Sequence, residues 1–118
     1  MKPHLLPWLA VALWLATAFA TPRAAAATRL NVVATTADLG SIATAVGGDH
    51  VEVTTLAKPT EDAHFVEPKP SFVRKLNQAD LLVEGGAELE VGWLPPLLQQ
   101  ARNPRINAGG ERHVRACE

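Results

Sequence analysis

The sequence contains a single cysteine and almost no net charge, and each of these features excludes a class of protein. Cys117 is the only cysteine among 118 residues, so no internal disulfide can form and the domain must be stabilised by its hydrophobic core. The formal net charge is −1 and no run of lysine or arginine occurs, which argues against nucleic acid as a partner. The 47% of hydrophobic residues fits one modest globular domain.

The motifs of common nucleotide-binding and hydrolytic enzymes are also absent. The pairs Gly47-Gly48 and Gly85-Gly86 match neither G-x-G-x-x-G nor G-x-x-x-x-G-K-[ST]. We interpret them as a helix terminator and a turn. Ser41 and Ser71 lack the nucleophile-elbow context and an obvious base partner. The chain is therefore not expected to be an enzyme.

Residues 1–27 are predicted to be a signal peptide that is removed from the mature protein. A short basic start, MKPH, is followed by the apolar run LLPWLAVALWLATAFA and the small-residue series TPRAAAAT. A membrane anchor is the alternative, but Pro7 interrupts the run and cleavage sites follow after Ala20 or Ala27. No cysteine for lipid attachment follows the run. An exported, soluble product over residues 28–118 is expected.

After residue 28, short β-branched runs alternate with helical periodicity. The sequence predicts strands over residues 29–36, 50–57 and 80–86, and helices over 37–48, 71–78 and 88–101. Four apolar residues share one face of the first helix: Leu39, Ile42, Ala43 and Val46. Pro95 and Pro96 must kink the third helix or start a new one. This alternation predicts an α/β fold, with a parallel sheet of three to four strands and flanking helices.

The stretch EDAHFVEPKPS lies in the loop from Ala57 to Lys69, after the second predicted strand. Open parallel sheets bind ligands beyond the carboxyl ends of their strands. Neutral imidazole is a good ligand for zinc and other transition ions, so His64 is a candidate metal ligand. Three nearby acids could orient the imidazole or attract a cation: Glu61, Asp62 and Glu67. From spacing alone, a solvated loop histidine is the favoured alternative.

Residues 32–98, from VVATTADLG to GWLPPLL, resemble the amino-terminal lobe of the metal-specific solute-binding proteins of bacterial ABC importers. This is the zinc and manganese uptake family, and the resemblance extends from about Leu30 to Gly110. Its most specific segment is a D-x-H-x-x-x-P loop, which runs here from Asp62 through His64 to Pro68. The stretch NQADLLVEGGAELE resembles the third strand of the family and the turn after it.

The resemblance implies that His64 binds the metal directly and that the transported ion is Zn²⁺ or Mn²⁺. It also implies a periplasmic protein whose partner is the permease of an ABC importer in the inner membrane. Family members have two α/β lobes with the metal between them, and their other ligands follow Gly110. Residues 28–118 are thus expected to be an incomplete, first lobe.

Several alternatives stay open at this point. The chain could be a small exported α/β enzyme with an unrecognised site, or a truncated fragment with no function of its own. The choice between zinc and manganese, the importer and the oligomeric state also stay open. The tail ERHVRACE departs from the family pattern. His113 in that tail is interpreted as incidental, and Cys117 as a thiol without structure around it.

Overall fold

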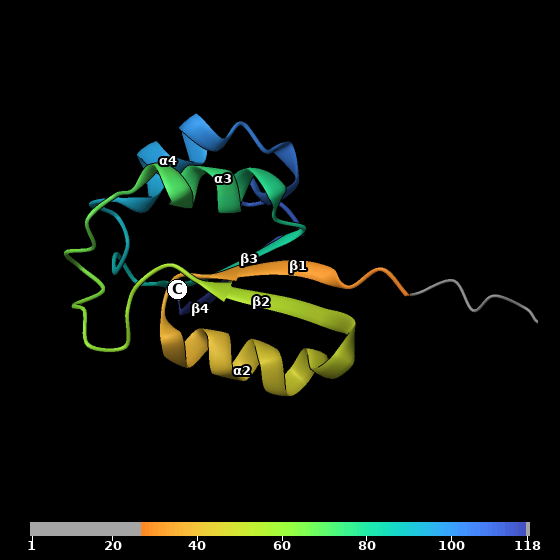
Figure 1. The fold of residues 1–118 in the computed structure, drawn as a ribbon. Helices are drawn as coiled ribbons and strands as arrows, with labels where there is room; N and C mark the ends of the chain where they lie inside the picture. Colours follow the sequence, from red (N-terminus) through yellow and green to blue (C-terminus); the bar gives the residue numbers. More distant parts are fainter. Residues whose placement is uncertain (1–26, 118) are drawn as a thin grey trace, which may run out of the picture.

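The protein contains a four-stranded parallel sheet with helices on both faces (Figure 1). The computed structural model describes residues 27–117, so the predicted signal peptide lies, except for its last residue, outside the described residues. The strands are β1 (Leu30–Ala34), β2 (Val51–Thr55), β3 (Leu81–Gly86) and β4 (His113–Cys117). Their order is β2-β1-β3-β4, and every neighbouring pair is parallel. The predicted α/β class is confirmed.

Three helices connect the strands. Helix α2 (Ala37–Gly47) joins β1 to β2, α3 (Pro70–Gln78) precedes β3, and α4 (Leu94–Ala101) precedes β4. Short 3₁₀ turns cover Gly48–His50 and Pro104–Ile106. Figure 1 shows α2 on one face of the sheet and α3 and α4 on the other. The connections from β1 and β3 therefore leave to opposite sides, which places a topological switch point between these two strands.

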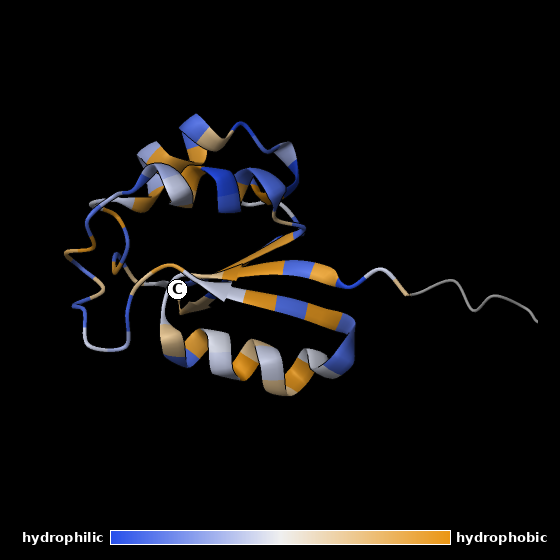
Figure 2. Ribbon diagram, in the orientation of Figure 1, coloured by the Kyte–Doolittle hydropathy of each residue, from blue (hydrophilic) through white to orange (hydrophobic). Residues whose placement is uncertain are grey.

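The face beneath α3 and α4 holds the main hydrophobic core. Phe72 and Leu76 of α3, Leu94 and Leu97 of α4, and Leu82 of β3 belong to one buried cluster. Figure 2 shows that hydrophobic residues predominate in β1 and β3, between the helical layers. Burial of this apolar surface is the main favourable term for folding in a domain without disulfides.

The opposite face is covered by α2 alone, and this helix approaches the sheet closely. Gly40 is its buried residue, and a Cβ at this position would clash with Thr55 Cγ2 of β2. Ile42 and Val46 are 60% and 84% exposed. Of the four apolar residues that predicted the helix, Leu39 and Ala43 are half-buried and Ile42 and Val46 are exposed; the closest approach to the sheet is at Gly40, which has no side chain.

The two adjacent prolines start a new helix, which was one of the two expected alternatives. Residues 87–93 form turns, and α4 begins at Leu94 with Pro95 and Pro96 in its first turn. The first N–H groups of a helix have no intrahelical partner, so proline is tolerated there. The predicted helix over 88–101 was thus too long at its amino end.

The tail is ordered, contrary to the expectation for Cys117. Residues 113–117 form β4, which pairs in register with β3 from Leu82–His113 to Gly86–Cys117. The segment HVRAC has only one β-branched residue, Val114, and is mostly exposed, so its pattern did not predict a strand; the pairing with β3 stabilises it. Cys117 itself is exposed. Among residues 27–117, no helix is long and apolar enough to cross a membrane.

Candidate functional site

The loop that carries His64 leaves the carboxyl end of β2, as the sequence predicted. Leu56 and Ala57 continue the pairing with β1 through hydrogen bonds from their N–H groups to Ala34 O (3.0 Å) and Thr35 O (2.9 Å). The chain then projects beyond the edge of the sheet and returns at Val66, which is 4% exposed and belongs to the core. The loop lies on the left in Figure 1, beside the carboxyl ends of the strands.

His64 and Asp62 form a tight turn at the tip of this loop. Asp62 Oδ1 accepts a hydrogen bond from the His64 backbone N–H at 2.9 Å and lies 2.8 Å from His64 Nδ1. Both side chains are 60% exposed. The hydrogen bond from the His64 backbone N–H, followed by that from the imidazole, lowers the pKa of Asp62 from its ordinary value of 3.8. Asp62 is therefore ionised at neutral pH.

This geometry selects a tautomer of His64. An ionised carboxylate can only accept hydrogen bonds, so the proton between Asp62 and His64 belongs to Nδ1. In the neutral ring, Nε2 then carries the free lone pair. A carboxylate on one imidazole nitrogen and a metal on the other is the usual arrangement of a metal-binding histidine.

The other two acidic candidates do not contact His64 in the described part of the chain. Glu61 Oε2 accepts a hydrogen bond from the backbone N–H of Lys58 at 3.1 Å, which closes the preceding turn. Glu67 is exposed and lies three positions after His64 in the sequence. Of the three predicted acids, the structure brings only Asp62 to the imidazole.

The remaining described histidines are far from this loop. His50 is exposed and precedes β2, at the opposite end of that strand from His64. His113 begins β4, on the opposite edge of the sheet from β2. Its side chain is 2% exposed, and its Nε2 lies 3.3 Å from Glu84 Oε2. His113 is thus part of the packing between β3 and β4.

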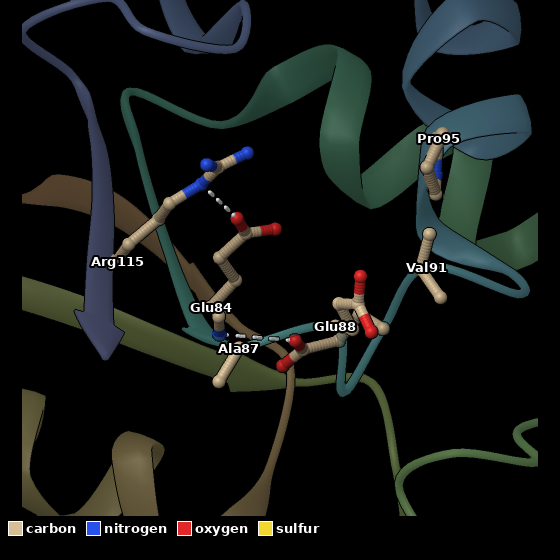
Figure 3. Close-up of a pocket in the computed structure, with 8 residues that line it drawn as sticks. Glu84, Ala87, Glu88, Val91, Pro95 and Arg115 are labelled. Atoms are coloured by element: carbon tan, nitrogen blue, oxygen red, sulfur yellow. Dashed lines mark hydrogen bonds and ion pairs between the residues drawn. The ribbon is translucent and has the colours of Figure 1, made fainter. Parts of the chain in front are cut away.

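A pocket of about 200 Å³ lies at the carboxyl ends of β3 and β4. Figure 3 shows Glu84 of β3 paired with Arg115 of β4 at this pocket, where the two atoms Oε1 and Nε are 2.6 Å apart. Glu90 also lines it, but its carboxylate already accepts three hydrogen bonds. No imidazole or thiol is among the lining residues. The carboxylates of Glu84 and Glu90 are thus engaged by protein partners, and the pocket offers no imidazole or thiolate of the kind that zinc favours.

One contact to the loop was not predicted from the sequence. Trp93, in the turn before α4, donates a hydrogen bond from its indole Nε1 to the carbonyl oxygen of Ala63 at 2.8 Å. Trp93 is 2% exposed and lies in the turn before α4, within the stretch 88–101 that the sequence predicted to be helical. The sequence offered no signal for the contact, because the two residues are 30 positions apart.

Comparison with known proteins decides the family. The sequence profile described as zinc-uptake complex component A, periplasmic (ZnuA) matches residues 32–114, more than half of the chain. The chain belongs to the ZnuA family. The resemblance noted in the sequence is thereby confirmed.

Curated relatives of this ZnuA-family chain are named as metal transport proteins. The metal ABC transporter substrate-binding lipoprotein ScbA of Streptococcus cristatus is 35% identical over 77 residues, 63% of this chain and 25% of that protein. The manganese ABC transporter substrate-binding lipoprotein PsaA of Streptococcus mitis is 32% identical over 98 residues, 80% of this chain and 32% of that protein. The chain thus spans about a quarter to a third of the length of these relatives.

Solved structures share the fold of this ZnuA-family chain. A crystal structure of ZnuA aligns with a TM-score of 0.57 and 28% identity, over 63% of this chain and 29% of that one. A manganese-bound periplasmic metal-binding protein of Candidatus Liberibacter asiaticus aligns with a TM-score of 0.55 and 25% identity, over 60% and 26%. The parallel sheet described above is therefore the sheet of one part of these longer proteins.

Of the histidines in residues 27–117, only His64 lies in the D-x-H-x-x-x-P loop. Within residues 27–117, no group of three or more His, Cys, Asp or Glu side chains is placed to hold a metal ion together. Zinc prefers about four ligands. Residues 27–117 therefore do not by themselves supply the roughly four ligands that zinc prefers.

Proposed function

We propose that this chain is the amino-terminal lobe of an exported metal-binding protein that delivers Zn²⁺ or Mn²⁺ to an ABC importer. The observation that carries the proposal is the Asp62–His64 pair, which sits in the D-x-H-x-x-x-P loop of a ZnuA-family chain and leaves Nε2 free. The loop lies at the carboxyl edge of a parallel sheet, where such folds bind ligands. Relatives named for metal and manganese transport support the choice of cargo.

In this proposal, His64 contributes one coordination bond through Nε2, and Asp62 fixes the ring and its tautomer. The other ligands come from a second lobe, as the family resemblance implies. Closure of two lobes on the ion would complete the coordination and opening would release it. The process consists of binding and transfer, with no covalent reaction step, so the chain is not proposed as an enzyme.

We further propose that the protein acts in the periplasm, with the permease of the importer as its partner. The proposal rests on the signal-peptide pattern of residues 1–27 and on the periplasmic description of the family. Sequencing the amino terminus of the chain recovered from the periplasm tests it. A new terminus after Ala20 or Ala27 is expected, and a chain retained whole in the cytoplasm would contradict it.

Calorimetric titration with ZnCl₂ tests the metal function, after circular dichroism has shown that each chain is folded. The unmodified chain is compared with His64→Ala and with His50→Ala, which removes an exposed imidazole from the opposite end of β2. Because one imidazole supplies only part of the coordination, we expect weak binding by this chain, which His64→Ala abolishes and His50→Ala leaves intact. Asp62→Asn is expected to weaken binding by roughly tenfold, because it loosens the ring and its tautomer.

The proposal would be wrong if zinc binding were unchanged by His64→Ala, or if His50→Ala reduced it equally. MnCl₂ titrated in parallel gives the preference between the two cargo ions.

A further inference from the structure

We infer that Trp93 is a positioning residue for His64, an inference that deepens the proposed function and rests on it. The indole N–H of Trp93 holds the loop by the carbonyl of Ala63, the residue immediately before His64. Neither the family comparison nor the sequence pattern assigns a role of this kind to Trp93.

The loop is held on both sides of an otherwise exposed histidine. His64 and Phe65 are exposed, whereas Val66 is buried in the core two residues after His64. On the amino-terminal side, the bond from Trp93 ties Ala63 to the turn before α4. The Asp62–His64 hydrogen bonds are internal to the turn, so they shape it without fixing it to the sheet.

Trp93 can serve as an anchor because its own turn is firmly attached. Glu90 is 3% exposed and accepts hydrogen bonds from Thr35 Oγ1 at 2.5 Å, Gly85 N at 2.7 Å and Gly86 N at 3.2 Å. These bonds connect the turn to the carboxyl ends of β1 and β3. The Trp93 backbone N–H donates in turn to Glu90 O at 3.2 Å. Ala63, the residue before His64, is thus connected to β1 and β3 through the hydrogen bonds of Trp93 and Glu90.

The backbone of this turn is unusual, which is consistent with an imposed geometry. Gly86, Ala87 and Glu88 all have positive φ angles, of 77°, 48° and 66°. Such conformations in residues other than glycine persist only where the surroundings determine them. The Glu90 carboxylate accepts from the N–H groups of Gly85 and Gly86 at the start of this stretch, and Trp93 stands at its end.

Anchoring of this kind should act on metal affinity. A loop that is already ordered loses less conformational entropy when it binds, so the free energy of coordination is not spent on ordering it. Loss of one neutral hydrogen bond corresponds to a change of about three- to tenfold in affinity. A purely structural role for Trp93 predicts a loss of stability but no specific loosening of the loop.

The experiment compares Trp93→Phe with Asn103→Ala. Phenylalanine keeps an aromatic ring in the core, but it removes the N–H donor together with part of the buried indole volume. Asn103 makes two comparable buried bonds, from Nδ2 to Leu76 O and Ala79 O at 2.8 Å each, but at the amino end of β3, away from His64. Amide hydrogen exchange of the metal-free chains is measured first, and ZnCl₂ affinity by calorimetry second.

In Trp93→Phe, we expect the amides of His64 and Phe65 to exchange faster and zinc to bind about three- to tenfold more weakly. Asn103→Ala should lower the melting temperature while leaving both loop exchange and zinc affinity unchanged. Unchanged exchange at His64 in Trp93→Phe would overturn the inference, as would an equal loss of affinity in Asn103→Ala.

A measurement on the unmodified chain decides the matter if Trp93→Phe fails to fold. The indole N–H resonance of Trp93 should exchange slowly and shift on titration with ZnCl₂, and no shift would overturn the inference. Failure of the proposed function is distinguishable from this outcome. If the proposed function is wrong, zinc binding will not depend on His64. The inference about Trp93 is tested separately, because amide exchange in Trp93→Phe is measured without metal.

Discussion

The two faces of the sheet are built in different ways. Beneath α3 and α4, large side chains such as Leu76 and Leu97 fill a continuous core. Beneath α2, contact is made by a glycine, while Ile42 and Val46 of that helix remain exposed. The loop that carries His64 takes its anchors from the first face, because Val66 and Trp93 both belong to the core cluster. The candidate site therefore depends on the face with the larger core.

The largest loss of stability is expected from a cavity in the core beneath α3 and α4. Leu76 is fully buried between α3 and the sheet, so Leu76→Ala should lower the free energy of unfolding by about 2–5 kcal/mol. Urea denaturation followed by circular dichroism measures the change. A loss below about 1 kcal/mol would mean that the α3–α4 face does not dominate stability.

A smaller loss is expected on the other face from Gly40→Ala. The added methyl group would clash with Thr55 Cγ2 and push α2 away from β2, which costs about 1–3 kcal/mol and outweighs the gain in helix propensity. Amide exchange should increase in α2 and not in α3. Thr55→Ser removes the clashing methyl, so the double variant should recover much of the loss. Failure of this rescue would show that close approach is not what Gly40 provides.

Truncation of the exposed apolar residues of α2 should have almost no effect. Ile42 and Val46 are 60% and 84% exposed, so replacing either by alanine should change the free energy of unfolding by less than about 0.5 kcal/mol. The measurement is the same urea denaturation. A loss as large as that of Leu76→Ala would mean that the two faces are equally packed.

The smallest effect is local to the loop and appears as a pH dependence. Because His64 lowers the pKa of Asp62 below 3.8, the interaction is present above that pH and is lost as the pH falls through the lowered pKa. A carbon-13 NMR titration of the Asp62 carboxyl should therefore give a midpoint below 3.8. In His64→Ala the midpoint should rise only in part, since the backbone N–H of residue 64 is the larger cause. An unchanged midpoint would exclude the side-chain contact.

Much of the fold could be predicted from the sequence because local patterns determine it. The β-branched runs gave β1, β2 and β3 to within about two residues at each end, and the alternation with helices indicated a parallel sheet. The position of His64 at the carboxyl edge followed from the same alternation. The Asp62 contact could also be predicted, since Asp62 and His64 are only two positions apart in one turn.

The features that the sequence did not predict depend on contacts between distant segments. The buried face of α2 is set by Thr55 on another element, which no periodicity within the helix encodes. Strand β4 contains a single β-branched residue, Val114, and its pairing partner β3 stabilises it. The Trp93 contact joins a turn to a loop 30 positions away. The role of His64 as a metal ligand remains a prediction.

The bond from Trp93 to Ala63 has a consequence for how the sequence can vary. Its acceptor is a main-chain carbonyl, so the side chain at position 63 takes no part in it. Glu90 likewise accepts from main-chain N–H groups at Gly85 and Gly86. The hydrogen bonds that connect the loop to the sheet through this turn thus depend on two side chains three positions apart, Glu90 and Trp93. Substitution of Ala63 should therefore leave this hydrogen bond intact, whereas few side chains can replace the indole of Trp93 as its donor.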